Sequence, residues 1–119
     1  MARLMHYQET TLWNKAMKLA ELACLATSSL PAEERYGVRL QITRAVVSVA
    51  SNIAEGWTRE SKRERAQFLA VAHGSLSELH TQLLLCGRIG WMRAERIHPM
   101  EALIDEVSRM LTVLRRRGR

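Results

Sequence analysis

The chain has 119 residues, of which 47% are hydrophobic and 25% are charged. This length is typical of one domain with its own core, and the composition excludes an intrinsically disordered chain. The formal net charge is +6, but four of the 18 Lys and Arg residues fall within residues 115–119. The rest of the chain is therefore close to neutral, which argues against a basic binding face along its whole length.

The apolar segments and the cysteines indicate the cellular compartment in which we expect the protein. No apolar run approaches the ~20 residues of a membrane-spanning helix, and the N-terminal segment lacks the continuous apolar core of a signal peptide. Cys24 and Cys86 lie in separate apolar patterns without a CxxC motif, so we predict two reduced thiols in the protein core. These features predict a cytoplasmic protein with no membrane partner.

Four helices are predicted from apolar residues that recur every three or four positions. The first spans about residues 11–27, with Thr10 or Thr11 as its N-cap. It ends before Pro31, because the residue preceding a proline is disfavoured in a helix. The second spans about residues 33–55, since proline suits the start of a helix and the acidic residues that follow favour its N-terminal dipole.

Gly56 and Gly74 are predicted to have different roles at and within helices. Gly56 follows the second helix and is predicted to adopt the left-handed conformation after its last turn. Gly74 lies inside the third helix, about residues 61–89, and is interpreted as a close contact with another helix. Ser61 and Glu64 match a capping box, which makes the start of the third helix the clearest of the four. The predicted core seam of this helix consists of Leu69, Ala72, Leu76, Leu79, Leu83 and Cys86.

The fourth helix, about residues 94–115, has two alternative starts. It begins near Ala94 and kinks at Pro99, or it begins at Pro99 itself. Short connections between four helices imply antiparallel neighbours. The predicted fold is therefore all-α, an up-down-up-down four-helix bundle in which residues 1–119 form a single domain with a short N-terminal arm and an Arg-rich tail.

The segment from Gln41 to Gly56 has no obvious face for solvent. Residues 45–54 contain no charged side chain, whereas a surface helix normally has a charged face. We therefore predict that this segment forms both core and subunit interface, with polar side chains that fix the register of helices or subunits. The residues predicted for this interface or polar network are Arg44, Val47, Ser48, Ala50, Asn52 and Glu55, with Glu78 on the third helix.

Catalytic and metal sites are poorly supported by the sequence. Glu55 and Glu78 could form an acid–base pair across a groove, but we prefer their assignment to the polar network. Di-iron bundles need two Glu-x-x-His motifs, and the sequence has one, Glu95–His98. A nucleophile elbow and a phosphate-binding glycine loop are absent. His73 and His80 share a helix face without an evident third ligand. No catalytic residue, cofactor or metal is predicted, and we do not expect an enzyme.

Two basic clusters are candidates for contact with nucleic-acid phosphates. The first lies where the second and third helices meet and is diluted by Glu60 and Glu64, and the second is the C-terminal tail. The alternative is a solvated corner and a disordered tail. Few aromatic residues lie among these cations, so base stacking is not predicted. The candidate contacts are Arg59, Lys62, Arg63 and Arg65 in the first cluster and Arg115, Arg116, Arg117 and Arg119 in the second.

Several segments, spread over about residues 9–114, resemble one protein family. They are Leu12–Met17, Tyr36–Val38, Gln41–Ser48, Ser51–Gly56 and Ala72–Leu79. The resemblance is to the four-helix bundle proteins encoded in intervening sequences of bacterial 23S ribosomal RNA genes. The accessory protein of diversity-generating retroelements is similar in fold. His73 departs from the family pattern, in which a small or aliphatic residue is more usual.

The resemblance implies an antiparallel bundle that assembles into a homopentameric ring, and a family in which most members have no established activity. Nucleic-acid binding by relatives is transferred to this chain as a hypothesis. We therefore prefer a non-enzymatic, homo-oligomeric scaffold that binds RNA, DNA or a nucleic-acid enzyme through basic surfaces. The alternative is a structural or protein–protein interaction module without a nucleic-acid role.

Overall fold

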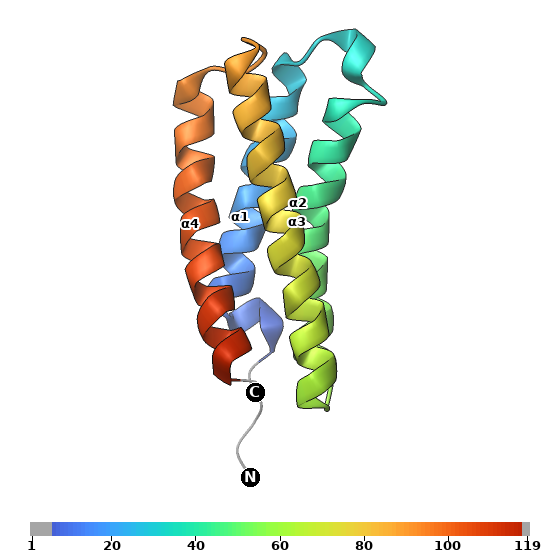
Figure 1. Cartoon of the computed structure of the whole chain (residues 1–119), viewed down its shortest axis with the longest axis vertical. Helices are drawn as coiled ribbons and strands as arrows, with labels where there is room; N and C mark the ends of the chain where they lie inside the picture. Colours follow the sequence, from blue (N-terminus) through green and yellow to red (C-terminus); the bar gives the residue numbers. More distant parts are fainter. Residues whose placement is uncertain (1–5, 118–119) are drawn as a thin grey trace.

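The computed structural model describes residues 6–117, which form an elongated bundle of 52 × 23 × 21 Å. Figure 1 shows helices that alternate in direction along the chain, so that each helix is antiparallel to the next. Each helix packs against its neighbours in sequence, and α1 also packs against α4. This arrangement confirms the predicted all-α four-helix bundle. The helices are α1 (Thr11–Ala26), α2 (Val38–Thr58), α3 (Lys62–Arg88) and α4 (Ala94–Arg117), with short 3-10 turns at η1 (Tyr7–Glu9), η2 (Thr27–Ser29) and η3 (Ala32–Glu34).

The core runs along the length of the bundle and receives apolar side chains from all four helices. All six residues of the seam predicted for α3 are buried, as are Ala45, Val46, Val49 and Ala50 of the uncharged segment of α2. Burial of each large aliphatic side chain contributes about 1.5–3 kcal/mol to folding. The bulky side chains that are fully buried include Leu19, Ile42, Val46, Ile53, Leu76, Leu79, Leu83, Met100 and Leu111.

The predicted start of the second helix at residue 33 is wrong. After Pro31 the chain forms only the 3-10 turn η3, and α2 begins at Val38. The break occurs at Gly37, whose φ of -101° and ψ of -117° lie outside the helical region. The Oε1 atom of Glu34 then accepts a hydrogen bond from the first backbone amide of α2, at 3.4 Å.

The predicted end of this helix at Glu55 is also wrong, because α2 continues to Thr58. Gly56 is a buried residue inside α2 and does not adopt a left-handed conformation. A Cβ atom at Gly56 would lie 3.2 Å from the Cβ of Phe68. Its role is thus to let α3 approach α2 closely. Gly74 was expected to have this role, but a Cβ atom there would meet no other atom within 4 Å.

The start of α3 follows the sequence signal, and the helix ends in a glycine turn. Ser61 caps α3 by accepting a hydrogen bond from the Glu64 amide at 3.2 Å. Gly90 has a φ of 81°, and the amides of Gly90 and Trp91 donate back to Gly87 and Cys86. This is a Schellman motif, in which glycine supplies the left-handed residue.

Of the two predicted starts for the fourth helix, the structure has the earlier one. α4 begins at Ala94 and includes Pro99 in its second turn. The prediction of two core cysteines is correct for Cys86, which is buried, and wrong for Cys24, which is exposed. Among the residues described, no helix combines the length and the apolar character needed to cross a membrane.

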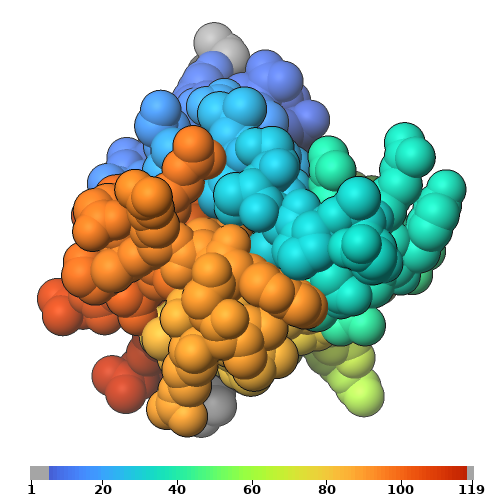
Figure 2. Space-filling model, turned by 90° about the horizontal axis from the view of Figure 1, so that it is seen from above, coloured from blue at the N-terminus to red at the C-terminus, as the bar shows by residue number. Residues whose placement is uncertain are grey.

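The two ends of the bundle differ in how they are covered. Figure 2 looks onto the end where α1 joins α2 (cyan) and α3 joins α4 (orange), and side chains of both connections cover the helix ends. Met92, in the α3–α4 turn, is buried there. At the opposite end, the α2–α3 corner and the last turns of α4 surround an open cavity of about 890 Å³. This opposite end also contains the candidate functional site.

Candidate nucleic-acid interface

The two basic clusters of the sequence meet at one end of the bundle. α1 and α3 begin and α2 and α4 end at this end, which we call the basic end (Figure 1). Residues 6–14, 55–65 and 115–117 contain seven Lys and Arg residues against four Glu. At the opposite end, residues 25–37 and 85–96 contain four Arg against three Glu. The positive charge is therefore concentrated at one end, although Arg119 lies outside the described residues.

Helix dipoles do not account for this asymmetry. In an antiparallel four-helix bundle, each end contains two helix N-termini and two helix C-termini, so the partial charges of the helix ends largely cancel. The electrostatic potential at the basic end therefore depends on its side chains. Its cations are of two kinds. Engaged cations have a hydrogen bond or ion pair with another described residue, and free cations have none.

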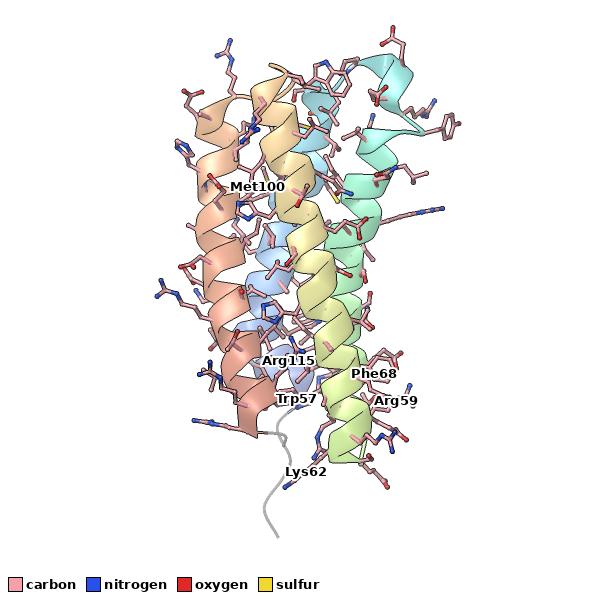
Figure 3. All side chains as sticks on the ribbon, in the orientation of Figure 1. Trp57, Arg59, Lys62, Phe68, Met100 and Arg115 are labelled. Carbon is pink, nitrogen blue, oxygen red and sulfur yellow. The ribbon has the colours of Figure 1, made fainter. Side chains whose placement is uncertain are left out.

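Arg59 and Arg65 hold the α2–α3 corner together. The Nη2 of Arg59 is 2.8 Å from the Oε2 of Glu55, and its guanidinium lies 4.8 Å from the ring centroid of Phe68. The Nη1 of Arg65 donates to the main-chain oxygens of Arg59 and Glu60, each at 2.9 Å. Figure 3 shows Arg59 and Phe68 on the same side of this corner. Both arginines are candidate phosphate contacts from the sequence, yet the Nη2 of Arg59 and the Nη1 of Arg65 already have partners. The buried Nε of Arg59 has no hydrogen-bond partner among the described residues.

Arg115 is engaged in a contact between α4 and α3. Its Nη1 donates to the Nδ1 of His73 at 3.0 Å. Because a guanidinium can only donate, the Nε2 of His73 must carry the ring proton, and it donates to the Oγ of Ser108 at 2.9 Å. Burial, and secondarily the nearby charge of Arg115, lower the pKa of His73 below its usual value. The tail residue Arg115 is thus part of the folded bundle.

The remaining cations of the basic end are free. Lys62, Arg63, Arg116 and Arg117 are exposed, and none has a hydrogen bond or ion pair with another residue of the described chain. In Figure 3, the side chain of Lys62 extends beyond the first turn of α3, away from the bundle. Exposed cations without partners are the ones that can neutralise phosphates without breaking existing contacts.

A polar network joins α2 and α3 at mid-height. The Oγ of Ser48 lies 2.8 Å from the Oγ of Ser75. The Nδ2 of Asn52 donates to the main-chain oxygen of Ser48 at 2.8 Å and to its Oγ at 3.0 Å. These contacts lie within one chain. They set the register between the two antiparallel helices.

This register separates the two carboxylates that could have formed a catalytic pair. From the Ser48–Ser75 contact, Glu55 lies seven residues towards the basic end and Glu78 lies three residues towards the opposite end. At 1.5 Å per residue, the two positions are roughly 15 Å apart along the bundle. Glu55 pairs with Arg59, and Glu78 accepts from the Nε2 of Gln82 at 3.3 Å. An acid–base pair is therefore incompatible with the geometry.

The other residues predicted for a subunit interface have different environments. Arg44 is exposed and has no ion pair among the residues described. Val47 is 52% exposed on the outer surface of α2. Ala50, by contrast, is buried in the core of its own chain. A second copy could therefore contact Arg44 and Val47 but not Ala50.

Comparison with known proteins assigns the family. The model of the 23S rRNA-intervening sequence proteins matches residues 8–113. The chain belongs to this family. A crystal structure of a protein of unknown function from the S23 ribosomal protein family of Bacteroides thetaiotaomicron is similar to this chain, with a TM-score of 0.80 and 19% identity. The likeness covers 88% of this chain and 98% of that chain, and at this identity it shows the fold alone. A search of curated proteins gave no match.

In this 23S rRNA-intervening sequence protein, several features of the basic end could not be read from the sequence pattern. The pairing of His73 with Arg115 joins residues 42 positions apart. The aromatic residues Trp57 and Phe68 lie among the cations of the α2–α3 corner, although the sequence did not predict base stacking (Figure 3). The sequence does contain a signal that Trp57 belongs to this cluster. It directly follows Gly56 and lies two positions before Arg59, one of the predicted phosphate contacts.

The potential metal ligands of the described residues are dispersed. Between residues 6 and 117, no group of three or more His, Cys, Asp or Glu side chains could hold a metal ion. His80, one of the two histidines considered in the sequence, has its Nε2 2.9 Å from the Oε2 of Glu101 on α4. This contact joins α3 to α4.

Proposed function

We propose that this member of the 23S rRNA-intervening sequence protein family is a non-enzymatic helical scaffold that binds RNA or DNA through its basic end. The observation that supports the proposal is the convergence of the two basic clusters, which leaves Lys62, Arg63, Arg116 and Arg117 free and exposed. Phosphate contacts of this kind release counterions and give a binding free energy that depends strongly on salt.

We also propose that the scaffold self-associates through the outer faces of α2 and α3. Residues 40–54 of α2 contain one charged residue, and residues 66–77 of α3 contain no Asp, Glu, Lys or Arg. The Ser48–Ser75 contact places these two segments, which together contain one charged residue, side by side. By contrast, residues 101–109 of α4 contain four charged residues. Depletion of charge is characteristic of the centre of a protein interface.

A second copy of the chain is the partner that best fits this face of low charge. Val47 and Val71 are each 52% exposed, on α2 and α3 respectively, and both would be covered in such an assembly. The family resemblance, which implies a homopentameric ring, gives the expected copy number. In a ring of aligned subunits the basic ends would lie on one rim, so that several weak phosphate contacts act together on one nucleic acid.

Removal of the free cations tests the nucleic-acid proposal. The variant Lys62→Ala/Arg63→Ala/Arg116→Ala/Arg117→Ala is expected to fold normally, because these exposed side chains have no hydrogen bond or ion pair within residues 6–117. We expect its affinity for labelled RNA and DNA at low salt, measured by fluorescence anisotropy, to fall at least tenfold.

The matched control removes the same number of charges at the opposite end. The variant Arg35→Ala/Arg88→Ala/Arg93→Ala/Arg96→Ala has the same net charge as the basic-end variant, and it is expected to retain most of the affinity. An equal loss in both variants would show that binding depends on net charge alone and would contradict the proposal. If the unmodified protein binds neither RNA nor DNA at low salt, the alternative of a protein–protein interaction module replaces it.

A further inference from the structure

The cavity at the basic end is lined by both apolar and charged side chains. Its volume is about 890 Å³, which is within the range of pockets that bind small ligands. One wall is apolar and includes Trp57, Leu69 and Leu114, from α2, α3 and α4. The charged part of the lining has four cations against one carboxylate, Glu60, and includes Lys62 at the first residue of α3 and Arg117 at the last residue of α4. The cavity therefore combines exposed cations with one aromatic side chain, Trp57.

Trp57 is the main aromatic surface in this cavity. It is half-buried, in the last turn of α2, and its side chain also borders a neighbouring cavity of about 470 Å³ between η1 and α4. Figure 3 shows Trp57 between the lower parts of α3 and α4. An indole next to exposed cations is the arrangement by which proteins stack nucleic-acid bases without reading their sequence.

The free and engaged cations around the cavity have different roles. Arg59 and Arg65 also line it, but their contacts with Glu55, Phe68 and the main chain hold the wall in place. Lys62 and Arg117 are the lining cations that remain free, and they come from two different helices, α3 and α4. Phosphates on either side of a base inside the cavity would meet these two side chains.

We propose that this cavity binds an unpaired base of single-stranded RNA or DNA, stacked on Trp57, while Lys62 and Arg117 bind the flanking phosphates. In a duplex the faces of the bases are covered by their neighbours, so a stacking site of this kind selects single strands, loops or ends. The proposal rests on the proposed function, because it specifies which nucleic acid the basic end binds.

The test compares three labelled probes of one sequence: a single strand, the same strand with abasic sites, and the duplex. For Trp57→Ala we expect a loss of roughly 5- to 150-fold in single-strand affinity, which is about 1–3 kcal/mol for one stacked base. Trp57→Phe should retain most of the affinity. Affinities for the abasic strand and the duplex should change less than twofold. Trp91→Ala, which removes a half-buried tryptophan at the opposite end, is the matched control and should leave all three affinities unchanged.

A second measurement covers the case in which Trp57→Ala fails to fold. In the variant Trp13→Phe/Trp91→Phe, Trp57 is the remaining tryptophan, and its fluorescence should be quenched by the intact single strand and not by the abasic strand. Equal binding of all three probes without quenching would overturn the stacking site and leave the proposed function intact. Absence of binding by every probe at low salt would overturn both.

Discussion

Gly56→Ala is expected to destabilise the bundle relative to Gly74→Ala, although both changes replace a glycine inside a helix. Each substitution gains about 1 kcal/mol of helix propensity. At Gly74 the added methyl group meets no atom within 4 Å, so we expect a net stabilisation of about 0.5–1 kcal/mol. At Gly56 the methyl carbon would lie 3.2 Å from the Cβ of Phe68. That atom is fixed to the backbone of α3, so α2 must move away to relieve the contact.

Overpacking of this kind costs about 1–3 kcal/mol. For a chain of this size, that difference corresponds to a melting temperature roughly 4–12 °C lower for Gly56→Ala than for Gly74→Ala. Thermal unfolding followed by circular dichroism measures the difference, and urea titration gives the free energies of unfolding. Equal stabilisation of the two variants would refute the inference that Gly56 sets the distance between α2 and α3.

Two further predictions concern the α3–α4 contact and the outer face of α2. The free energy of unfolding should fall as the pH decreases below 6.5, because the pKa of His73 is lowered in the folded chain and returns to about 6.5 on unfolding. The unfolded state therefore takes up the proton first, so this part of the stability is present above pH 6.5 and lost as the pH falls through the folded-state pKa. The free energy of unfolding, measured by urea titration, should depend less on pH in His73→Gln than in His80→Gln. Identical pH profiles for the two variants would disprove the assignment of this pH dependence to His73. Val47→Asp should retain the helical circular dichroism spectrum but lower the mass measured by light scattering, whereas Ala50→Asp should unfold the chain because it buries an unpaired charge. A wild-type mass for Val47→Asp would place the interface elsewhere.

The helices and their buried faces were predictable from the sequence because each helix repeats its apolar residues at the helical period. The seam of α3 illustrates this, since all of its predicted residues are buried. Capping chemistry that involves neighbouring residues was also predictable, as at Ser61 and Glu64. These signals are local, and a single sequence contains them in full.

The ends of α2 and the roles of its glycines were not predictable for a physical reason. A glycine near a helix end can terminate the helix or allow a close approach by another helix, and only the position of the other helix decides between them. Gly56 lies inside α2, and Phe68 of α3 approaches it closely. Gly37 interrupts the predicted start, and the Glu34 side chain bonds to the first amide of the delayed helix.

The candidate site was predictable as two separate clusters of cations. Their meeting at one end follows from the antiparallel order of the helices, so the predicted fold already implied it. The division into free and engaged cations did not follow, because it depends on contacts with residues distant in sequence. Arg115 shows this most clearly, since its partner His73 lies on a different helix.

The central claim is that the free cations of the basic end bind phosphates, and the salt dependence of binding tests it most directly. Four free cations per chain predict a slope of log affinity against log salt of about −2.8 on a single strand and about −3.6 on a duplex, for each chain that makes all its contacts. The variant that lacks Lys62, Arg63, Arg116 and Arg117 should lose most of this slope. If this variant retains the slope of the unmodified protein, phosphates bind elsewhere and the account is contradicted.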